Sequence, residues 1–254
     1  MTLTTLSVDC GGTGLKALLL DDSGEQLSER VRVPTPYPMG PDRFVAELVA
    51  LVSGLAGFDR ATVGMPGMIR HGTVVSTPHY PRLAGPFTPL DQVLADRWRG
   101  FDAEAALTEA FGRPTRVLND AEVQGAAVVS GAGLELVLTL GTGLGSAIFD
   151  NGSLAPHLEL SHHPFRHGQT YDQQLGTKAR KAAGQQRWVR RVRRAVEVLR
   201  PVVFFDRLYV GGGNAKHLPD DLGADVTIVS NTAGMLGGVR AWDLDHSQRG
   251  GRHS

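Results

Sequence analysis

Two short glycine-rich segments contain residue types suited to binding phosphate. They read Asp9-Cys10-Gly11-Gly12-Thr13-Gly14-Leu15-Lys16 and Thr139-Leu140-Gly141-Thr142-Gly143-Leu144-Gly145-Ser146. Each lies between two apolar, β-prone runs, so each is predicted to be the turn of a β-hairpin. Glycine lets a backbone approach a ligand closely, and the N–H groups of such a turn can cradle an anion.

The first segment also carries charged and hydroxyl side chains. Thr13 adds a hydroxyl donor, Lys16 adds a positive charge, and Asp9 could hold Mg²⁺ directly or through water. An ordinary hairpin turn is the alternative, but the pattern occurs twice in equivalent places, which favours two walls of one phosphate-binding cleft. The predicted donor-phosphate residues are Asp9, Gly11, Gly12, Thr13, Lys16, Gly141, Thr142, Gly143 and Gly145.

Asn119-Asp120 lies between the two glycine segments, where an apolar strand ends and a helix is expected to begin. One interpretation is a helix N-cap, for which Asn and Asp are favoured. The other is catalytic: Asp120 would orient a substrate hydroxyl and accept its proton as the oxygen attacks phosphorus. A free Asp has a pKa of about 3.9 and is a weak base, which suits late proton acceptance in a loose transition state.

Two further segments contain candidate ligand-binding residues. Glu159 and His162 are three residues apart and could hydrogen-bond one substrate, although a polar loop with scattered histidines is the alternative. Metal binding is disfavoured there, because no defined ligand spacing and no nearby Cys is present. The run Gly211-Gly212-Gly213-Asn214 follows a predicted strand and could let a flat nucleobase lie against the backbone.

A basic stretch follows the histidine-containing segment. Its arginines are Arg187, Arg190, Arg191, Arg193, Arg194 and Arg200. Its apolar residues are Trp188, Val192, Ala195, Val196 and Leu199, at the spacing of one helix face. The favoured interpretation is the solvated face of a packed helix. The alternative is a track for a polyanion such as a long phosphate chain.

The strands and helices expected around these residues indicate an α/β protein. Each glycine hairpin opens a series of strands and helices, which indicates two similar half-domains around a cleft. We expect half-domains at residues 1–118 and 119–242 and a flexible tail at 243–254, with a last helix at 231–242 that could pack back on the first half. The proline-rich segment 72–90 is predicted to be an ordered loop over a site.

Composition excludes several functional classes. The 254 residues contain 26 Lys plus Arg and 26 Asp plus Glu, so charge gives no reason to expect nucleic-acid or membrane binding. The single cysteine, Cys10, excludes a disulfide within the chain and a Cys-based zinc site. The N-terminal residues lack a signal-peptide pattern, and no apolar run approaches the ~20 residues of a membrane span. We therefore expect a cytoplasmic protein.

The ordered set of motifs resembles the ROK family of sugar kinases. The motifs are Asp9-x-Gly-Gly-Thr13-x-x-Lys16, Asn119-Asp120, Leu140-Gly-Thr-Gly-x-Gly145 and Val210-Gly-Gly-Gly-Asn214. The resemblance covers residues 5–242 and is closest to the polyphosphate-glucokinase branch. It implies the actin-like ATPase fold with two ribonuclease-H-like halves. It also implies a homodimer that uses Mg²⁺ and transfers a phosphoryl group from ATP, polyphosphate or both to the 6-hydroxyl of a hexose. Glucose is the favoured hexose.

The same resemblance implies a role for each motif. Asp120 would be the catalytic base, and Asn119, Asp120, Glu159 and His162 would hold the sugar. The hairpins would be the two phosphate motifs, and Gly211, Gly212, Gly213 and Asn214 would bind the nucleotide.

The chain departs from the family pattern at two places. It has Ser161 where the family usually has Gly, and it lacks the cysteines of the zinc motif, so we expect no zinc. Because the phosphate motif starts at residue 9, no helix-turn-helix is expected before it, which disfavours a DNA-binding regulator. Kinases for another sugar or small alcohol, and a non-catalytic sugar-binding protein, remain as alternatives.

Overall fold

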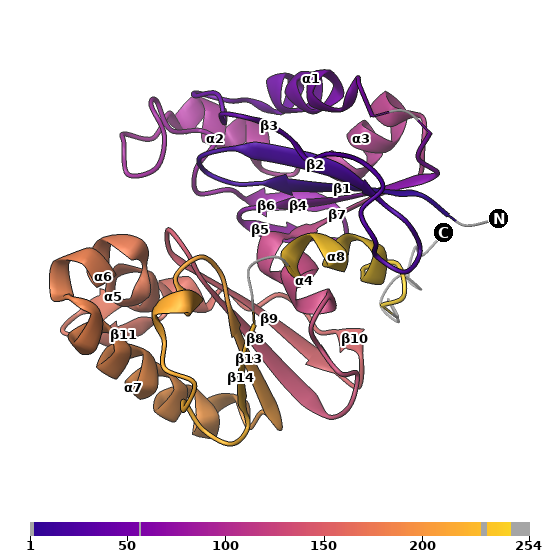
Figure 1. Cartoon of the computed structure of the whole chain (residues 1–254). Helices are drawn as coiled ribbons and strands as arrows, with labels where there is room; N and C mark the ends of the chain where they lie inside the picture. Colours follow the sequence, from indigo (N-terminus) through magenta and orange to yellow (C-terminus); the bar gives the residue numbers. More distant parts are fainter. Residues whose placement is uncertain (1–2, 56, 230–232, 245–254) are drawn as a thin grey trace, which may run out of the picture. The chain divides into compact units, whose positions relative to one another are not determined.

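The computed structural model describes residues 3–55, 57–229 and 233–244, and the chain divides into two compact units (Figure 1). Unit 1 contains residues 1–127 and 234–243, and unit 2 contains residues 128–233 and 244–254. No helix among the described residues is long and apolar enough to cross a bilayer. The expected tail falls largely on residues 245–254, which lie outside the described part of the chain.

Unit 1 is built on a five-stranded sheet in the order β3-β2-β1-β4-β7. The strands are β1 (Thr5–Cys10), β2 (Leu15–Leu20), β3 (Val31–Val33), β4 (Arg60–Met65) and β7 (Thr115–Asn119), with a separate hairpin of β5 (Met68–Arg70) and β6 (Thr73–Ser76). β1 pairs antiparallel with β2 and parallel with β4, and β4 is parallel to β7. The parallel strands therefore end at one edge of the sheet, where Asp9 and Asn119 lie.

Helices cover both faces of this sheet (Figure 1). They are α1 (Pro41–Val52), α2 (Gln92–Trp98), α3 (Ala103–Phe111), α4 (Asp120–Ala126) and α8 (Ala233–Arg240). α1 and α3 pack on one face, and α4 packs against β4 and β7. Phe44, Tyr80 and Trp98 form an aromatic cluster in the core with centroids 5.4–5.5 Å apart, and the Trp98 indole N–H donates to the Met39 carbonyl.

Unit 2 has a sheet of matching order, β10-β9-β8-β13-β14. The strands are β8 (Leu134–Leu140), β9 (Leu144–Asp150), β10 (Ser153–Leu154), β13 (Arg207–Gly211) and β14 (Val226–Ile228), with a small hairpin of β11 (Pro164–Arg166) and β12 (Gln169–Thr170). The helices are α5 (Tyr171–Leu175), α6 (Thr177–Ala183) and α7 (Gln185–Val203), with 3-10 turns η1 (Leu160–His162) and η2 (Ala215–His217). As in unit 1, an antiparallel hairpin adjoins two parallel strands.

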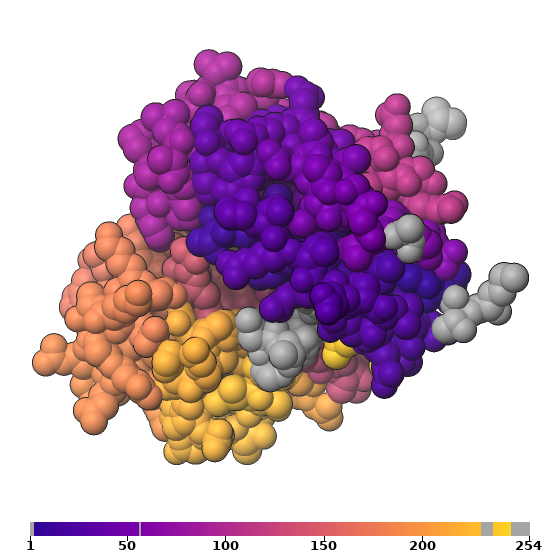
Figure 2. Space-filling view, turned by 45° about the horizontal axis from the view of Figure 1, so that its top comes forward, coloured from indigo at the N-terminus to yellow at the C-terminus, as the bar shows by residue number. Residues whose placement is uncertain are grey.

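The amphipathic pattern of α7 is confirmed, because Trp188, Val192, Ala195, Val196 and Leu199 are all buried. The orange segment that contains α5, α6 and α7 reaches the molecular surface in Figure 2. The apolar stripe therefore faces the core of unit 2 and leaves the arginines toward solvent.

The structure refines several expected boundaries. Both glycine segments join antiparallel strands, as predicted. The compact units divide after Ala127, whereas the predicted half-domains divide after residue 118, because α4 packs on strands of unit 1. α8 is grouped with unit 1 as well. The segment 72–90 contains β6, and α2, which follows it, has no counterpart in the sequence-based prediction.

We expect Thr62→Val to destabilise unit 1. The buried Thr62 hydroxyl donates to the Gly238 carbonyl at 2.7 Å and accepts from the Trp242 indole N–H at 2.9 Å, so it ties the C-terminal segment to β4. Valine would leave both partners unsatisfied, at a cost of about 1–3 kcal/mol. Urea unfolding followed by circular dichroism measures the effect. Thr227→Val on an exposed position of β14 is the control, and an equal midpoint for the two variants would contradict this role.

Candidate functional site

The first glycine hairpin brings a carboxylate and an ammonium group together. The Gly11 N–H donates to the Gly14 carbonyl at 3.0 Å and closes the turn. Asp9 and Lys16 are direct partners in the β1–β2 ladder, and the Lys16 ammonium donates to the Asp9 carboxylate at 2.7 Å. Both side chains are about one-third exposed, at 36% for Asp9 and 30% for Lys16, so the pair remains open to a charged ligand.

Hydroxyl groups from distant segments hold the carbonyls of this hairpin. Thr35 donates to the Gly11 carbonyl at 2.7 Å, and Tyr37 donates to the Gly12 carbonyl at 2.7 Å. Tyr80 donates to the carbonyl of Cys10 at 3.2 Å. Burial raises the pKa of Tyr37 to about 12, so its phenol stays a donor at neutral pH.

The proline-rich segment 72–90 lies over the first hairpin. A Cβ added at Gly12 would meet the His79 ring at 3.1 Å and the Pro86 ring at 3.2 Å. Burial and the charge of Arg82 both lower the pKa of His79, so its imidazole is neutral at pH 7. Glycine at position 12 thus gives this loop room to approach the turn.

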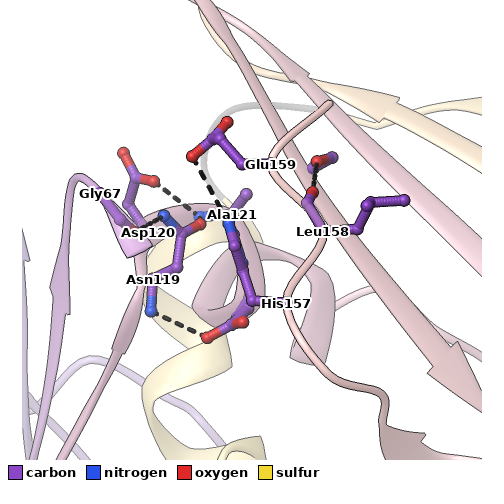
Figure 3. Close-up of polar contacts among 9 residues, drawn as sticks. Gly67, Asn119, Asp120, Ala121, His157, Leu158 and Glu159 are labelled. Atoms are coloured by element: carbon purple, nitrogen blue, oxygen red, sulfur yellow. Dashed lines mark hydrogen bonds and ion pairs between the residues drawn. The ribbon is translucent and has the colours of Figure 1, made fainter. Parts of the chain in front are cut away.

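The Asn119-Asp120 motif is both a helix cap and a candidate catalytic group (Figure 3). The Asn119 side chain accepts from the Ala121 N–H at 2.8 Å, and the Asn119 N–H donates to the Glu122 carboxylate at 2.9 Å, which completes a capping box. The Asn119 amide also donates to the Gly67 carbonyl at 2.7 Å. Asn119 therefore supplies the cap, and Asp120 is the half-buried first residue of α4.

The two candidate carboxylates of unit 1 lie near one thiol. Burial raises the pKa of Cys10 well above its usual value, and the negative charges of Asp9 and Asp120 add to that effect. Asp9 near the end of β1 and Asp120 directly after β7 lie at the same edge of the sheet, because β1, β4 and β7 are parallel. A Mg²⁺ ion bound with phosphates typically takes one or two protein carboxylates and keeps several waters. This donor set fits such an ion, and Asp9 is the residue that could hold it.

Three hydrogen bonds to one backbone carbonyl hold the second glycine hairpin in place. Its Gly141 carbonyl accepts from the Thr177 hydroxyl at 2.8 Å, from the Thr177 N–H at 2.9 Å and from the Asn214 amide at 2.9 Å. A Cβ at Gly212, where φ is +86°, would lie 2.6 Å from the backbone of Leu140. The glycine run after β13 therefore packs directly on the phosphate hairpin, and the buried Asn214 side chain ties the two together. Its predicted contact with a nucleotide stays a prediction.

Asp172 is a positioning residue that the sequence analysis did not select. Its carboxylate accepts the Leu144 N–H at 2.9 Å, and a Cβ at Gly143 would overlap the same carboxylate oxygen. Burial raises the pKa of Asp172, and the hydrogen bond from Leu144 opposes that rise. Asp172 is part of no recognisable sequence motif, so its contact with the hairpin is evident only from the folded structure.

Glu159 lies beside His157 (Figure 3), and His162 follows it three residues later in the sequence. Its carboxylate is 3.5 Å from the His157 imidazole, and the Leu158 carbonyl accepts from the Ser146 hydroxyl at 2.7 Å, which anchors the segment to β9. Burial alone would raise the pKa of Glu159, but hydrogen bonds from His157 and Ser161 and the charges of His157 and His162 lower it overall. Glu159 is therefore an ionised acceptor, and the exposed His162 lies on the 3-10 turn beside it.

In the described residues, no three His, Cys, Asp or Glu side chains are placed to hold a metal ion. Three arginines of α7 are ion-paired: Arg193 with Asp221, Arg194 with Glu197 and Arg200 with Asp225. These pairs agree with the favoured interpretation of a solvated helix face.

Comparisons with known proteins agree with this architecture. The ROK family model matches residues 5–157. A polyphosphate glucokinase of Mycobacterium tuberculosis is 25% identical over 250 residues, which span 92% of this chain and 89% of that protein. An N-acetylmannosamine kinase of Escherichia fergusonii is 32% identical over 160 residues, 60% of this chain and 49% of that protein. The crystal structure of an inorganic polyphosphate/ATP-glucomannokinase from Arthrobacter sp. strain KM has 30% identity and a TM-score of 0.77, covering 95% of this chain and 99% of that one.

The matched fold and motifs define a sugar kinase, a phosphotransferase with an alcohol group as acceptor. The chain belongs to the ROK family and has its actin-like ATPase fold. The predicted family and fold class are thereby confirmed. The roles of the individual site residues remain proposals.

We expect Asp172→Ala to weaken binding of the phosphoryl donor. Loss of the acceptor for the Leu144 N–H would loosen the hairpin, and one such hydrogen bond corresponds to about a tenfold increase in the donor KM. Asp172→Asn keeps an acceptor oxygen and is expected to retain most of the affinity. Steady-state kinetics of sugar-phosphate formation compares the two. Equal losses in both variants would argue against a positioning role.

We expect Glu159 to make folding stability depend on acid pH. Because its folded pKa lies below the usual 4.5, its ionised form contributes stability above pH 4.5, and that contribution is lost as the pH falls through the lowered value. Glu159→Gln should therefore lose less stability on acidification than the wild type. Thermal unfolding across this range measures the slope, with Glu29→Gln at an exposed position as the control. Parallel slopes for wild type and Glu159→Gln would rule the effect out.

Proposed function

We propose that this chain is a hexose kinase that transfers the terminal phosphoryl group of ATP, polyphosphate or both to the 6-hydroxyl of glucose. The observation that carries the proposal is the placement of Asp120. It stands at the start of α4, where Asn119 makes the capping bonds, and it shares an edge of the sheet with the Asp9–Lys16 pair. A carboxylate next to a phosphate-binding turn is the arrangement that hydroxyl-to-phosphate transfer requires.

The chemistry assigns one role to Asp120. Its carboxylate accepts a hydrogen bond from the sugar hydroxyl and aims that oxygen at the terminal phosphorus. As the new P–O bond forms, the donor's bridging P–O bond breaks and its electron pair leaves with the remaining phosphate. The hydroxyl proton passes to Asp120. Because the transition state is loose, a weak base such as a carboxylate can serve as the acceptor.

Other groups stabilise charge and orient the sugar. Lys16 and the N–H groups of the glycine hairpins offset negative charge on the transferred group. Mg²⁺, when bound, would neutralise further phosphate charge, and Asp9 would hold it. The ionised Glu159 carboxylate accepts hydrogen bonds from sugar hydroxyls, and His162 supplies another polar contact. Both polar atoms of the Asn119 amide already have protein partners, so its contribution to sugar binding includes the positioning of Asp120.

The relatives support glucose as the acceptor and also suggest a second candidate. One relative is named a polyphosphate glucokinase, and a solved neighbour is named a glucomannokinase that uses inorganic polyphosphate or ATP. Mannose is therefore the second acceptor to test. N-acetylmannosamine is a further choice, because the kinase with that name matches over part of the chain.

We expect Asp120→Asn to lower kcat by about 10²- to 10⁴-fold, the usual contribution of a general base. The assay measures sugar-phosphate formation from glucose, mannose and N-acetylmannosamine, with ATP and polyphosphate in parallel and Mg²⁺ present. Asp22→Asn in an exposed turn is the matched control and should retain full activity. Circular dichroism shows that both variants are folded.

Two outcomes would contradict the proposal. Undiminished activity of Asp120→Asn would remove the assigned base. Absence of product from the folded wild type with every sugar and both donors would exclude a hexose kinase of this kind. Calorimetric titration with glucose would then distinguish a non-catalytic sugar-binding protein from a kinase for a different acceptor.

A further inference from the structure

The segment from α6 to the middle of α7 is strongly basic. Residues 177–196 contain eight Lys or Arg and no Asp or Glu; the eight are Lys178, Arg180, Lys181, Arg187, Arg190, Arg191, Arg193 and Arg194. The whole chain is balanced at 26 positive and 26 negative residues, so this concentration is local. These cations do not share one environment, and their placement separates two groups.

The cations farther along α7 have partners within the protein. Arg193 pairs with Asp221 at 2.9 Å, and Arg194 pairs with Glu197 at 3.1 Å. Arg191 donates to the carbonyl of Gln174. These contacts describe a solvated helix face, where exposed ion pairs contribute little to binding or stability.

The cations of α6 lie beside the second phosphate hairpin. Thr177, whose hydroxyl donates to the Gly141 carbonyl, is followed three and four residues later by Arg180 and Lys181, which are on the same face of the helix. Arg180 donates to the Asn214 side chain at 3.1 Å, and Asn214 donates to Gly141 at 2.9 Å. Two hydrogen bonds thus connect the Arg180 guanidinium to the turn.

The 3-10 turn η2 adds a further cation to this face. Asn214, which Arg180 contacts, directly precedes this turn, and Lys216 lies within it. Burial and then the charges of Arg180 and Lys216 lower the pKa of His217, the last residue of the turn. The Gln185 amide donates to the His217 carbonyl at 3.2 Å and brings the start of α7 to the same place. We call Arg180, Lys181 and Lys216 the basic surface. Lys181 and Lys216 are exposed.

We propose that the basic surface binds the phosphate units of inorganic polyphosphate that lie beyond the transferred one. The inference rests on the proposed function, which assigns donor phosphates to the Gly141 hairpin. A polyphosphate chain carries negative charge along its whole length, so a chain held at the hairpin continues onto adjacent cations. Of the Asp residues that follow η2, Asp221 pairs with Arg193 and Asp225 pairs with Arg200.

The surface favours polyphosphate over a nucleotide for an electrostatic reason. ATP has three phosphates and then an uncharged nucleoside, which gains little from cations placed beyond the hairpin. Each further phosphate of a long chain can pair with an ammonium group and release counterions. The basic surface should therefore raise affinity for long chains and leave turnover of the bound donor unchanged.

The test compares two double variants that remove equal charge. Lys181→Gln/Lys216→Gln changes the basic surface, and Arg187→Gln/Arg190→Gln changes two exposed cations of α7 that are not part of it. With glucose as acceptor, we expect the first variant to raise the KM for long-chain polyphosphate by about fivefold to tenfold, because each exposed charge contact is worth a factor of roughly two to five. Its kcat, and its KM for ATP and tripolyphosphate, should change less than twofold. The second variant should behave like the wild type with every donor.

Direct binding separates failure of this inference from failure of the proposed function. Fluorescence anisotropy of labelled long-chain polyphosphate needs no catalysis, and the wild type should bind with a steeper salt dependence than Lys181→Gln/Lys216→Gln. If no donor supports turnover, the proposed function fails, while this measurement still tests the surface. Equal binding by the wild type and Lys181→Gln/Lys216→Gln would overturn the inference. An equal loss in Arg187→Gln/Arg190→Gln, or displacement of polyphosphate by a single-stranded oligonucleotide at the same concentration, would overturn it as well.

Discussion

Both glycine hairpins have backbone carbonyls that are satisfied by side chains from elsewhere in the chain. A turn that presents N–H groups to phosphate must still have its other polar groups paired, since unpaired backbone groups that leave water are costly. In unit 1, hydroxyls of Thr35, Tyr37 and Tyr80 meet this need. In unit 2, Thr177 and Asn214 converge on the Gly141 carbonyl. The segments that carry these donors are thereby held against the turns.

This pairing explains why loops and short helices, besides strands, surround the candidate phosphate sites. The proline-rich segment packs so closely on Gly12 that an added Cβ would crowd its His79 and Pro86 rings. Asp172 occupies the equivalent space beside Gly143 and holds the Leu144 N–H. Glycine at these positions therefore has two physical consequences: it leaves the turn open to a ligand, and it lets supporting groups pack directly against the backbone.

Charge is arranged locally within a chain that is neutral overall. Asp9 and Lys16 form a partly exposed pair at the first hairpin, and the histidines around Glu159 keep that carboxylate ionised despite its burial. Cations gather at α6 and η2, next to the second hairpin. Each unit therefore carries charged groups beside its own glycine hairpin.

The sequence alone determined the features that arise from local patterns. The glycine runs between β-prone segments predicted both hairpins, and the spacing of Trp188, Val192 and Leu199 predicted the buried face of α7. Asn119-Asp120 could be recognised as a cap or a catalytic pair, because a strand ends there and a helix begins. The resemblance of the ordered motifs to one family predicted the fold that the comparisons confirm.

The tertiary structure alone decided which residues support those motifs. Tyr37, Asp172 and Thr177 each contribute one contact from a different segment, and a single residue leaves no periodicity or spacing to read. The structure also showed that Asn119 forms the capping box at the start of α4, and it separated the ion-paired arginines of α7 from the cations beside the hairpin. Such assignments depend on contacts between segments that are far apart in the sequence. Long-range packing determines these contacts, and local sequence patterns do not reveal them.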